Sequence, residues 1–324
     1  MKTLMLIFLF IIVTNINAQQ KLAQTGFNFL SVSNDARASA IGEAVTSFQN
    51  YSGALFYNPA SMAQMDKFFN ANFSINQWIA DIKHITASMI ISPFNGDMGV
   101  IGFSIQSVDY GEVEGTMVAN NEKGYVDTKI MKPTALAVGI GYAKMLNDKF
   151  GVGGQVRYVY QKLGESIVPT KDGTVEKENK ANALAFDFGT VYKTGFKSIT
   201  FGMSVRNFSK EVKYEEEGFQ LPLNFVIGIS ANLFDFVNVG LNNQTLLVSI
   251  DYTHPRSRPE QLKIGTEYQF MNIIYLRGGY IIGNYEDNIT FGVGITYSGF
   301  NIDYSYTPYG IFNNVQRITA RISF

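Results

Sequence analysis

The sequence has no cysteine and, in 324 residues, only 1 tryptophan, 8 prolines and 2 histidines. Without cysteine the chain can form no disulfide framework, thiolate metal site or lipoprotein anchor, and it has no cysteine nucleophile. Charged residues make up only 16 % of the chain, against about a quarter in typical soluble domains. The formal net charge of −1, with no basic cluster, argues against nucleic acid as a partner. An aromatic content of 14 % excludes a disordered chain.

Long apolar runs are missing beyond residue 18, where no stretch approaches the ~18 residues of a membrane-spanning helix. The apolar run at residues 4–13 follows the basic Lys2, and it is too short to cross a bilayer core of ~30 Å. Small Ala18 ends the polar segment that comes next. This pattern predicts a secretory signal peptide over residues 1–18, cut after Ala18.

From about residue 68 onward, large apolar residues alternate with small or polar ones at a period of 2. Ile289, Phe291 and Val293, for example, are separated by threonine and glycine. The alternation predicts fourteen strands, at 68–80, 82–94, 98–112, 132–146, 149–164, 180–193, 199–210, 221–234, 243–254, 259–270, 273–283, 288–297, 299–308 and 314–324. Many of these segments exceed the ~9–11 residues that cross a bilayer obliquely, whereas soluble strands average ~5–6. The predicted fold class is therefore an all-β, 14-stranded antiparallel transmembrane β-barrel over residues 67–324, in the bacterial outer membrane.

Connections between the predicted strands alternate in length, as in barrels with short periplasmic turns and long external loops. The longest, at 113–131, 165–179 and 211–220, all fall on one side, and tight turns such as Ser298-Gly299 fall on the other. The charged run from Lys171 to Lys180 and the triplet Glu215 to Glu217 are therefore expected on solvated external loops. The chain ends in Phe324, and a last strand with a terminal aromatic resembles the signal read by the outer-membrane barrel assembly machinery. An ordinary edge strand ending in phenylalanine is the alternative.

A barrel of fourteen strands has a predicted backbone diameter of ~28 Å, wider than its inward side chains can fill. The inward positions are rich in glycine, which leaves space for water, a ligand or a plug. Residues 19–66 precede the barrel and lack its alternation, so they are predicted to form an N-terminal, partly helical hatch. Charged residues at predicted inward positions are Arg157, Asp187, Arg206, Asp251, Glu267, Arg277 and Asp303. Because buried charges need partners, we expect a structural network, partly with the hatch; a substrate path is the alternative.

The hatch segment carries two expected helical turns, one capped by Asn34 or Asp35 and one beginning near Pro59. The runs Gly26-Phe27-Asn28-Phe29-Leu30, Asp35-Ala36-Arg37-Ala38, Ile41-Gly42-Glu43-Ala44 and Asn58-Pro59-Ala60 resemble the amino-terminal signature of the PorV/PorQ family, relatives of FadL-type fatty-acid transport barrels. The hatch or gate residues marked in this way are Asp35, Arg37, Gly42, Glu43, Tyr57, Asn58, Pro59 and Ala60.

The resemblance implies a FadL-like barrel in the outer membrane of a bacterium that uses type IX secretion. In that system the PorV-like member binds the carboxy-terminal sorting domain of cargo and carries it to the attachment complex, where a sortase-like peptidase acts. The PorQ-like member belongs to that complex. Expected partners are therefore outer-membrane lipid and translocon, sortase-like or cargo proteins. There are two departures from the pattern. Tyr57 in place of tryptophan is a mild change of aromatic, whereas a chain short for a cargo shuttle points to a paralogue with another partner.

Residues suited to catalysis are sparse. His84 and His254 are isolated and expected at the surface near external loops, and the chain has no G-x-S-x-G, H-E-x-x-H, P-loop or EF-hand pattern. We therefore expect a non-enzymatic protein with no cofactor and no metal site. Two functions remain open: a protein-binding barrel of type IX secretion, and a FadL-like transporter of hydrophobic small molecules. The transporter would hold a lipid or hydrophobic ligand in its lumen, with Asn58-Pro59-Ala60 as gate.

Overall fold

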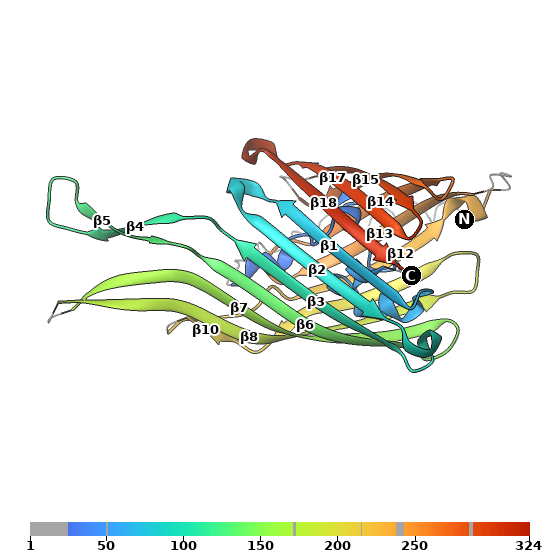
Figure 1. Ribbon diagram of the computed structural model, residues 1–324, viewed down its shortest axis with the longest axis horizontal. Coiled ribbons are helices and arrows are strands. Elements are labelled where there is room, and N and C mark those ends of the chain that lie inside the picture. The colour runs from blue at the N-terminus through green and yellow to red at the C-terminus, as the bar shows by residue number, and fades with distance from the viewer. Residues whose placement is uncertain (1–24, 50, 171–172, 215, 238–242, 285–287) are drawn as a thin grey trace, which may run out of the picture.

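The computed structural model describes residues 25–49, 51–170, 173–214, 216–237, 243–284 and 288–324. The predicted signal peptide, residues 1–18, lies outside this part of the chain. Within the described residues, fourteen antiparallel strands pair into one closed barrel (Figure 1). They are β1 (Phe69–Gln77), β2 (Lys83–Ile91), β3 (Val100–Asp109), β6 (Thr134–Met145), β7 (Phe150–Thr170), β8 (Gly173–Lys193), β9 (Thr200–Ser209), β12 (Asn224–Asn232), β13 (Gln244–Pro255), β14 (Gln261–Phe270), β15 (Ile274–Ile282), β16 (Ile289–Tyr297), β17 (Phe300–Pro308) and β18 (Asn314–Ser323).

The predicted fold class is confirmed, because each barrel strand overlaps one of the segments expected from the alternation. Burial alternates along the strands as a barrel requires. In β3, for example, every second side chain is buried in the lumen, and Ile101, Phe103 and Ile105 point outward. Outward apolar and inward small or polar residues are what gives the sequence its period of 2.

Two segments that were expected as long loops are mostly strands. β4 (Val113–Val118) and β5 (Tyr125–Met131) form a hairpin, and β7 and β8 continue their pairing to Thr170 and Gly173. The prediction was wrong here because these hairpins project from the barrel, where most side chains on both faces are exposed and the alternation disappears. The described part of the charged run, from Gly173 to Lys180, therefore lies on β8 and not on a loop. Glu216 and Glu217 do lie in a connection, between β10 (Val212–Lys213) and β11 (Gly218–Phe219).

Both long hairpins, β4–β5 and β7–β8, project from the same end of the barrel (Figure 1). We call this the external end, and the opposite end, with its short turns, the periplasmic end, following the usual orientation of such barrels. At the periplasmic end Ser298 and Gly299 connect β16 to β17 with φ values of 48° and 83°, the positive values that a tight two-residue hairpin turn requires. The barrel closes where β1 pairs with β18, and the Phe324 ring stacks on Phe69 at 6.1 Å.

The predicted hatch, of which residues 25–49 and 51–66 are described, lies inside the barrel (Figure 1). Its short helices are η1 (Asn28–Ser31), α2 (Ala36–Ala40), η2 (Ser52–Phe56) and η3 (Pro59–Gln64). Asp35 caps α2 by accepting from the Ala38 amide, and Asn58 caps η3 by accepting from the Ala60 amide. The hatch begins at the external end, where the Gly26 amide donates to Gln220, and leads into β1 at the periplasmic end. None of the described helices has the length and apolar character to cross a membrane.

Candidate functional site

The hatch rests directly on the backbone of the barrel wall where the wall has glycine. A Cβ on Gly279 of β15 would lie 2.2 Å from the Gly42 nitrogen, and one on Gly153 of β7 would lie 2.6 Å from the Ala60 nitrogen. Gly202 and Gly265 meet the hatch backbone in the same way. The inward glycines therefore provide seats for the hatch, and a larger side chain at these positions would push it away.

A chain of ion pairs joins α2 to the wall. Arg37 donates two hydrogen bonds to Glu267, of 2.8 Å from Nε and 2.7 Å from Nη2. Arg277 donates to Glu267 and to Asp303, both at 2.6 Å, and its side chain is fully buried. The structure thus brings one predicted hatch residue together with three predicted lumen charges, and each buried charge has an opposite charge beside it.

Three more contacts hold the middle of the hatch. The Glu43 carboxylate pairs with Lys263 at 2.6 Å, and the Thr46 amide donates to Asp251 at 2.9 Å. Arg206 donates from Nη1 to the carbonyl of Phe56 at 3.1 Å. Lys263 did not enter the sequence prediction, although its inward position in the alternation of β14 would have identified it.

Arg157 and Asp187 pair with each other, and neither has a hydrogen bond or ion pair with a described residue of the hatch. Arg157 Nε donates to Asp187 at 2.7 Å, and the other carboxylate oxygen accepts from the Asn207 amide, also at 2.7 Å. Asn207 has a φ of 62° and marks a register shift between β8 and β9. This ion pair therefore holds a β-bulge in the barrel wall.

The residues expected at a gate are fixed by buried contacts. Tyr57 accepts a hydrogen bond from the Asn34 amide at 3.0 Å, which explains the departure from tryptophan, because an indole N–H cannot accept. Asn58 donates to the carbonyls of Thr46 and Thr190, at 2.7 and 3.1 Å, and Pro59 occupies the first turn of η3. Gly42 has a φ of 63° and donates to Thr290 at 3.0 Å.

Two hatch carboxyl groups differ in their ionisation. Burial raises the pKa of Asp35 to about 6, although its hydrogen bond from the Ala38 amide acts in the opposite direction. Burial also disfavours ionised Glu43, but the Lys263 ammonium outweighs this and the pKa of Glu43 falls to about 2. At neutral pH Glu43 is therefore charged and anchors the hatch through Lys263. Asp35, with a pKa of about 6, becomes protonated on mild acidification.

The surface position expected for His84 is wrong. Its side chain is only 2 % exposed, because its place in β2 points into the lumen, where its ring lies 6.3 Å from that of Trp78. His254 has a half-exposed side chain and lies 2.9 Å from Glu260, as expected for a surface residue. Among the described residues no group of three or more His, Asp or Glu side chains is arranged as a metal site.

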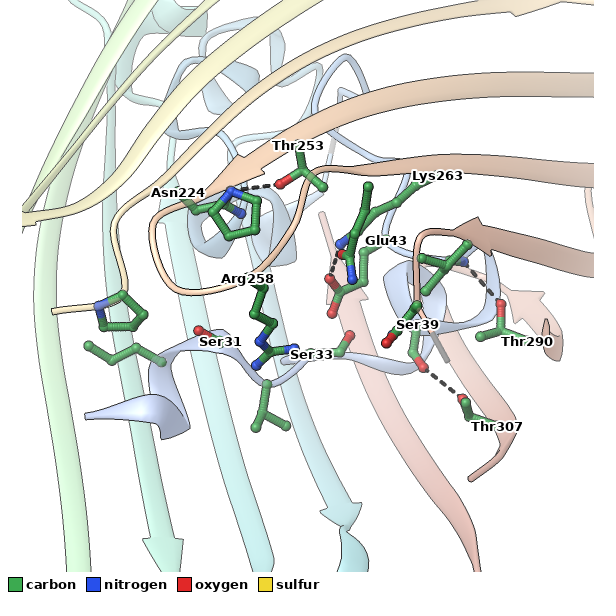
Figure 2. A pocket seen from close by; sticks show the side chains of 18 of the residues that line it. Ser31, Ser33, Ser39, Glu43, Asn224, Thr253, Arg258, Lys263, Thr290 and Thr307 are labelled. Carbon is green, nitrogen blue, oxygen red and sulfur yellow. Dashed lines mark hydrogen bonds and ion pairs between the residues drawn. The ribbon is translucent and has the colours of Figure 1, made fainter. Parts of the chain in front are cut away.

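A polar cavity of about 100 Å³ opens above the hatch at the external end. Its lining includes the cationic side chains of Arg206, Arg258, Lys263 and Arg317 and the carboxylate of Glu43. Figure 2 shows Ser31 and Ser33 of the hatch and Thr253 of the wall around this space, with Ser39 of the hatch hydrogen-bonded to Thr307 of the wall. The cavity is therefore hydroxyl-rich, with an excess of positive charge. Arg317, which donates to Ser39 at 2.6 Å, and Arg258 were not identified from the sequence.

An aromatic cavity of about 430 Å³ adjoins the polar one. The aromatic residues that line it are Phe27, Phe29, Trp78, His84, Tyr110 and Tyr214. Val32, Trp78 and Arg258 line both cavities. The external mouth thus has an apolar half and a polar, cationic half beside each other.

The two external hairpins offer a second candidate surface. Lys129 of β5 pairs with Glu165 of β7, at 3.8 Å, and with Glu176 of β8. These pairs connect the hairpins to each other outside the barrel. Among the described strands, β9 pairs with β8 only from Ala185 onward, and Val212 of β10 packs beside Ala181, so only part of the outer edge of β8 lacks a neighbouring strand.

Comparisons with known proteins place this geometry in a family. The family model described as type IX secretion system protein PorV matches residues 15–253. The fold is similar to the Ralstonia pickettii toluene transporter TbuX (14 % identity, TM-score 0.59, 90 % of this chain and 99 % of that one) and to a Pseudomonas aeruginosa FadL homologue (12 %, 0.59, 90 % and 99 %). It is also similar to the CymD monoaromatic hydrocarbon channel (11 %, 0.61, 90 % and 98 %). A search of curated protein sequences gave no match.

The family match covers more than half of the chain, and the similar structures share its closed barrel. Both agree with the signature in the hatch and with the apolar outward face of the strands. The protein is therefore an outer-membrane β-barrel with a FadL-like fold, and it belongs to the PorV family of type IX secretion system proteins.

Proposed function

We propose that this protein is a non-enzymatic barrel that acts in type IX secretion by binding cargo sorting domains, or translocon or attachment-complex proteins, at the cell surface. The observation that carries the proposal is the contrast between a hatch seated on wall glycines and two hairpins that project from the external end. Opening the lumen would separate many buried contacts, whereas the hairpins are accessible without any rearrangement.

The hairpins are suited to contact with protein. β7 and β8 have 21 residues each, and the outer edge of β8 offers unpaired backbone groups. Such an edge can accept a strand from a partner, and the Lys and Glu side chains along it would restrict the choice of partner. We place the binding surface on the β4–β5 and β7–β8 hairpins together, because Lys129 connects them.

Shortened hairpins test this proposal. Lys162 faces Lys180 in the register of β7 and β8, so an Asn-Gly turn can replace residues 163–179 without moving the barrel. We expect this variant to lose more than tenfold of the translocon, sortase-like or cargo-tail protein that co-purifies from detergent-solubilised membranes. Lys210→Gln, at the same end but outside both hairpins, is the matched control. Undiminished recovery with the shortened β7–β8 hairpin would refute the proposal.

Transport of a hydrophobic small molecule is the second candidate, and the aromatic cavity of about 430 Å³ favours it. This function predicts a lipid or hydrophobic ligand in the lumen of the purified protein, detectable by mass spectrometry after extraction. It also predicts normal cargo secretion in a deletion strain. A strain that stops secreting cargo would exclude transport as the main function.

Export by a cleaved signal peptide is part of the same proposal. The basic start, the short apolar run and Ala18 support it. Amino-terminal sequencing of the protein purified from outer membranes should begin at Gln19, and a chain that retains residues 1–18 would contradict the prediction.

A further inference from the structure

A basic cleft of about 450 Å³ lies at the periplasmic end, far from the hairpins and the two external cavities. It lies between the β6–β7 turn, which contributes Lys149, and the end of β8 with the turn that follows, which contribute Lys193 and Lys197. The Lys193 amide donates to the Lys149 carbonyl at 2.7 Å, so the two chain segments are held side by side. Gln49 of the hatch also lines the cleft.

Several hydrogen-bond donors of this cleft have no acceptor among the described residues. The ammonium groups of Lys149 and Lys193 have no ion pair or hydrogen bond with any described residue, and the buried Nε2 of Gln49 has no acceptor among them. Lys197 uses one hydrogen on the carbonyl of Asp235, at 2.6 Å, and keeps two. Asp148 is the single carboxylate of the lining, so the cleft has an excess of positive charge.

Exposed apolar side chains lie on the same chain segments that form the cleft. Leu146 and Phe196, in the two turns, are each 61 % exposed, and Tyr192 at the end of β8 is 43 % exposed. Exposed aromatic residues at strand ends lie at the level of the lipid headgroups in an outer-membrane barrel. A ligand held here would therefore have a negative group in the cleft and acyl chains along the neighbouring strands.

We propose that the cleft binds the phosphate of a glycerophospholipid in the periplasmic leaflet. Lys149 and Lys193 neutralise the phosphate, and the Gln49 amide donates to it from inside the barrel. The lipid thereby connects the wall to the hatch at the end where β1 begins. A soluble anion would use the same donors but would gain nothing from the exposed Leu146 and Phe196, which is why we assign a lipid.

The test uses the full-length protein in a neutral detergent, titrated with phosphatidylglycerol and followed by native mass spectrometry. A lysine near a phosphate changes lipid affinity about 5-fold, so Lys149→Gln with Lys193→Gln should weaken the tightest bound lipid about 25-fold. Lys149→Arg with Lys193→Arg keeps both charges and should retain binding, which separates loss of charge from loss of folding. Lys210→Gln with Lys213→Gln removes two lysines at the external end and should leave this lipid in place.

Two results would overturn the inference. The first is unchanged phosphatidylglycerol binding in the Lys149→Gln, Lys193→Gln variant. The second is displacement of the lipid by an equal concentration of glycerol 3-phosphate, which would show that the cleft recognises a soluble phosphate. Retention of phosphatidylglycerol in the presence of glycerol 3-phosphate supports the lipid assignment.

Discussion

Replacing Gly279 by alanine should loosen the hatch without touching any charged group. The added Cβ would lie 2.2 Å from the Gly42 nitrogen and 2.5 Å from Thr290 Oγ1, so the hatch must retreat by about 1.2 Å to reach ordinary contact. That movement breaks the hydrogen bond of 3.0 Å from Gly42 to Thr290. Overpacking costs about 1–3 kcal/mol and a buried unpaired amide another ~1–3 kcal/mol. We therefore expect a loss of about 2–6 kcal/mol in the free energy of unfolding.

Gly278 provides the matched control, since it is the preceding residue of the same strand. A Cβ there meets only Thr266 Oγ1, at 3.7 Å, so Gly278→Ala shares every effect on the unfolded chain but leaves the hatch undisturbed. The single tryptophan, Trp78, lines both external cavities, and its emission can follow urea unfolding in lipid vesicles. Equal unfolding midpoints for the two variants would refute the view that the hatch is seated on wall glycines.

Three further predictions concern charge, pH and assembly. Glu267→Gln removes the carboxylate that Arg37 and Arg277 share, although Arg277 keeps Asp303, and should cost about 3–5 kcal/mol in urea unfolding, whereas Glu165→Gln in an exposed hairpin should change little. Because burial raises the pKa of Asp35 from 3.8 to about 6, its contribution to stability is complete below pH 3.8 and is lost as pH rises through 6. The Asp35→Asn variant keeps the cap but should lack this pH-dependent change of about 3 kcal/mol in the free energy of unfolding. An equal pH dependence in the variant and the unmutated chain would contradict the prediction. Phe324→Ala removes the ring stacked on Phe69 and should lower the amount of heat-modifiable folded barrel in membranes; an unchanged amount would exclude an assembly signal.

Strand positions were predictable because the bilayer imposes one physical rule on every crossing segment. Outward residues such as Phe103 and Phe291 face lipid, and the residues between them face the lumen. The same parity placed Glu267, Arg277 and Asp303 inward, and it would have added Lys263 and Arg317 had it been applied to every strand. Outside the bilayer this rule no longer applies, so the alternation does not predict the outer halves of β7 and β8 as strands.

The sequence predicts which side chains point into the lumen better than it predicts which of them pair with each other. No pattern in the sequence says that Arg37 meets Glu267, 230 residues away, or that Arg157 pairs with its neighbour on β8. These pairings depend on where the hatch lies in the lumen. The inward orientation of His84 could have been predicted from the alternation along β2. Its aromatic surroundings could not, because the neighbouring Trp78 lies in a connection without periodicity.

The position of the hatch has a consequence for assembly. Its first described residues contact Gln220 at the external end, its last residues lead into β1 at the periplasmic end, and β1 joins β18 only when the whole chain is present. The hatch must therefore be inside before the seam between β1 and β18 closes. In the closed barrel every strand is paired on both edges, so the hatch can leave sideways only if the seam opens. Withdrawing the hatch through either mouth instead would separate the Arg37–Glu267 and Glu43–Lys263 ion pairs, so leaving the barrel in any direction costs the hatch buried contacts.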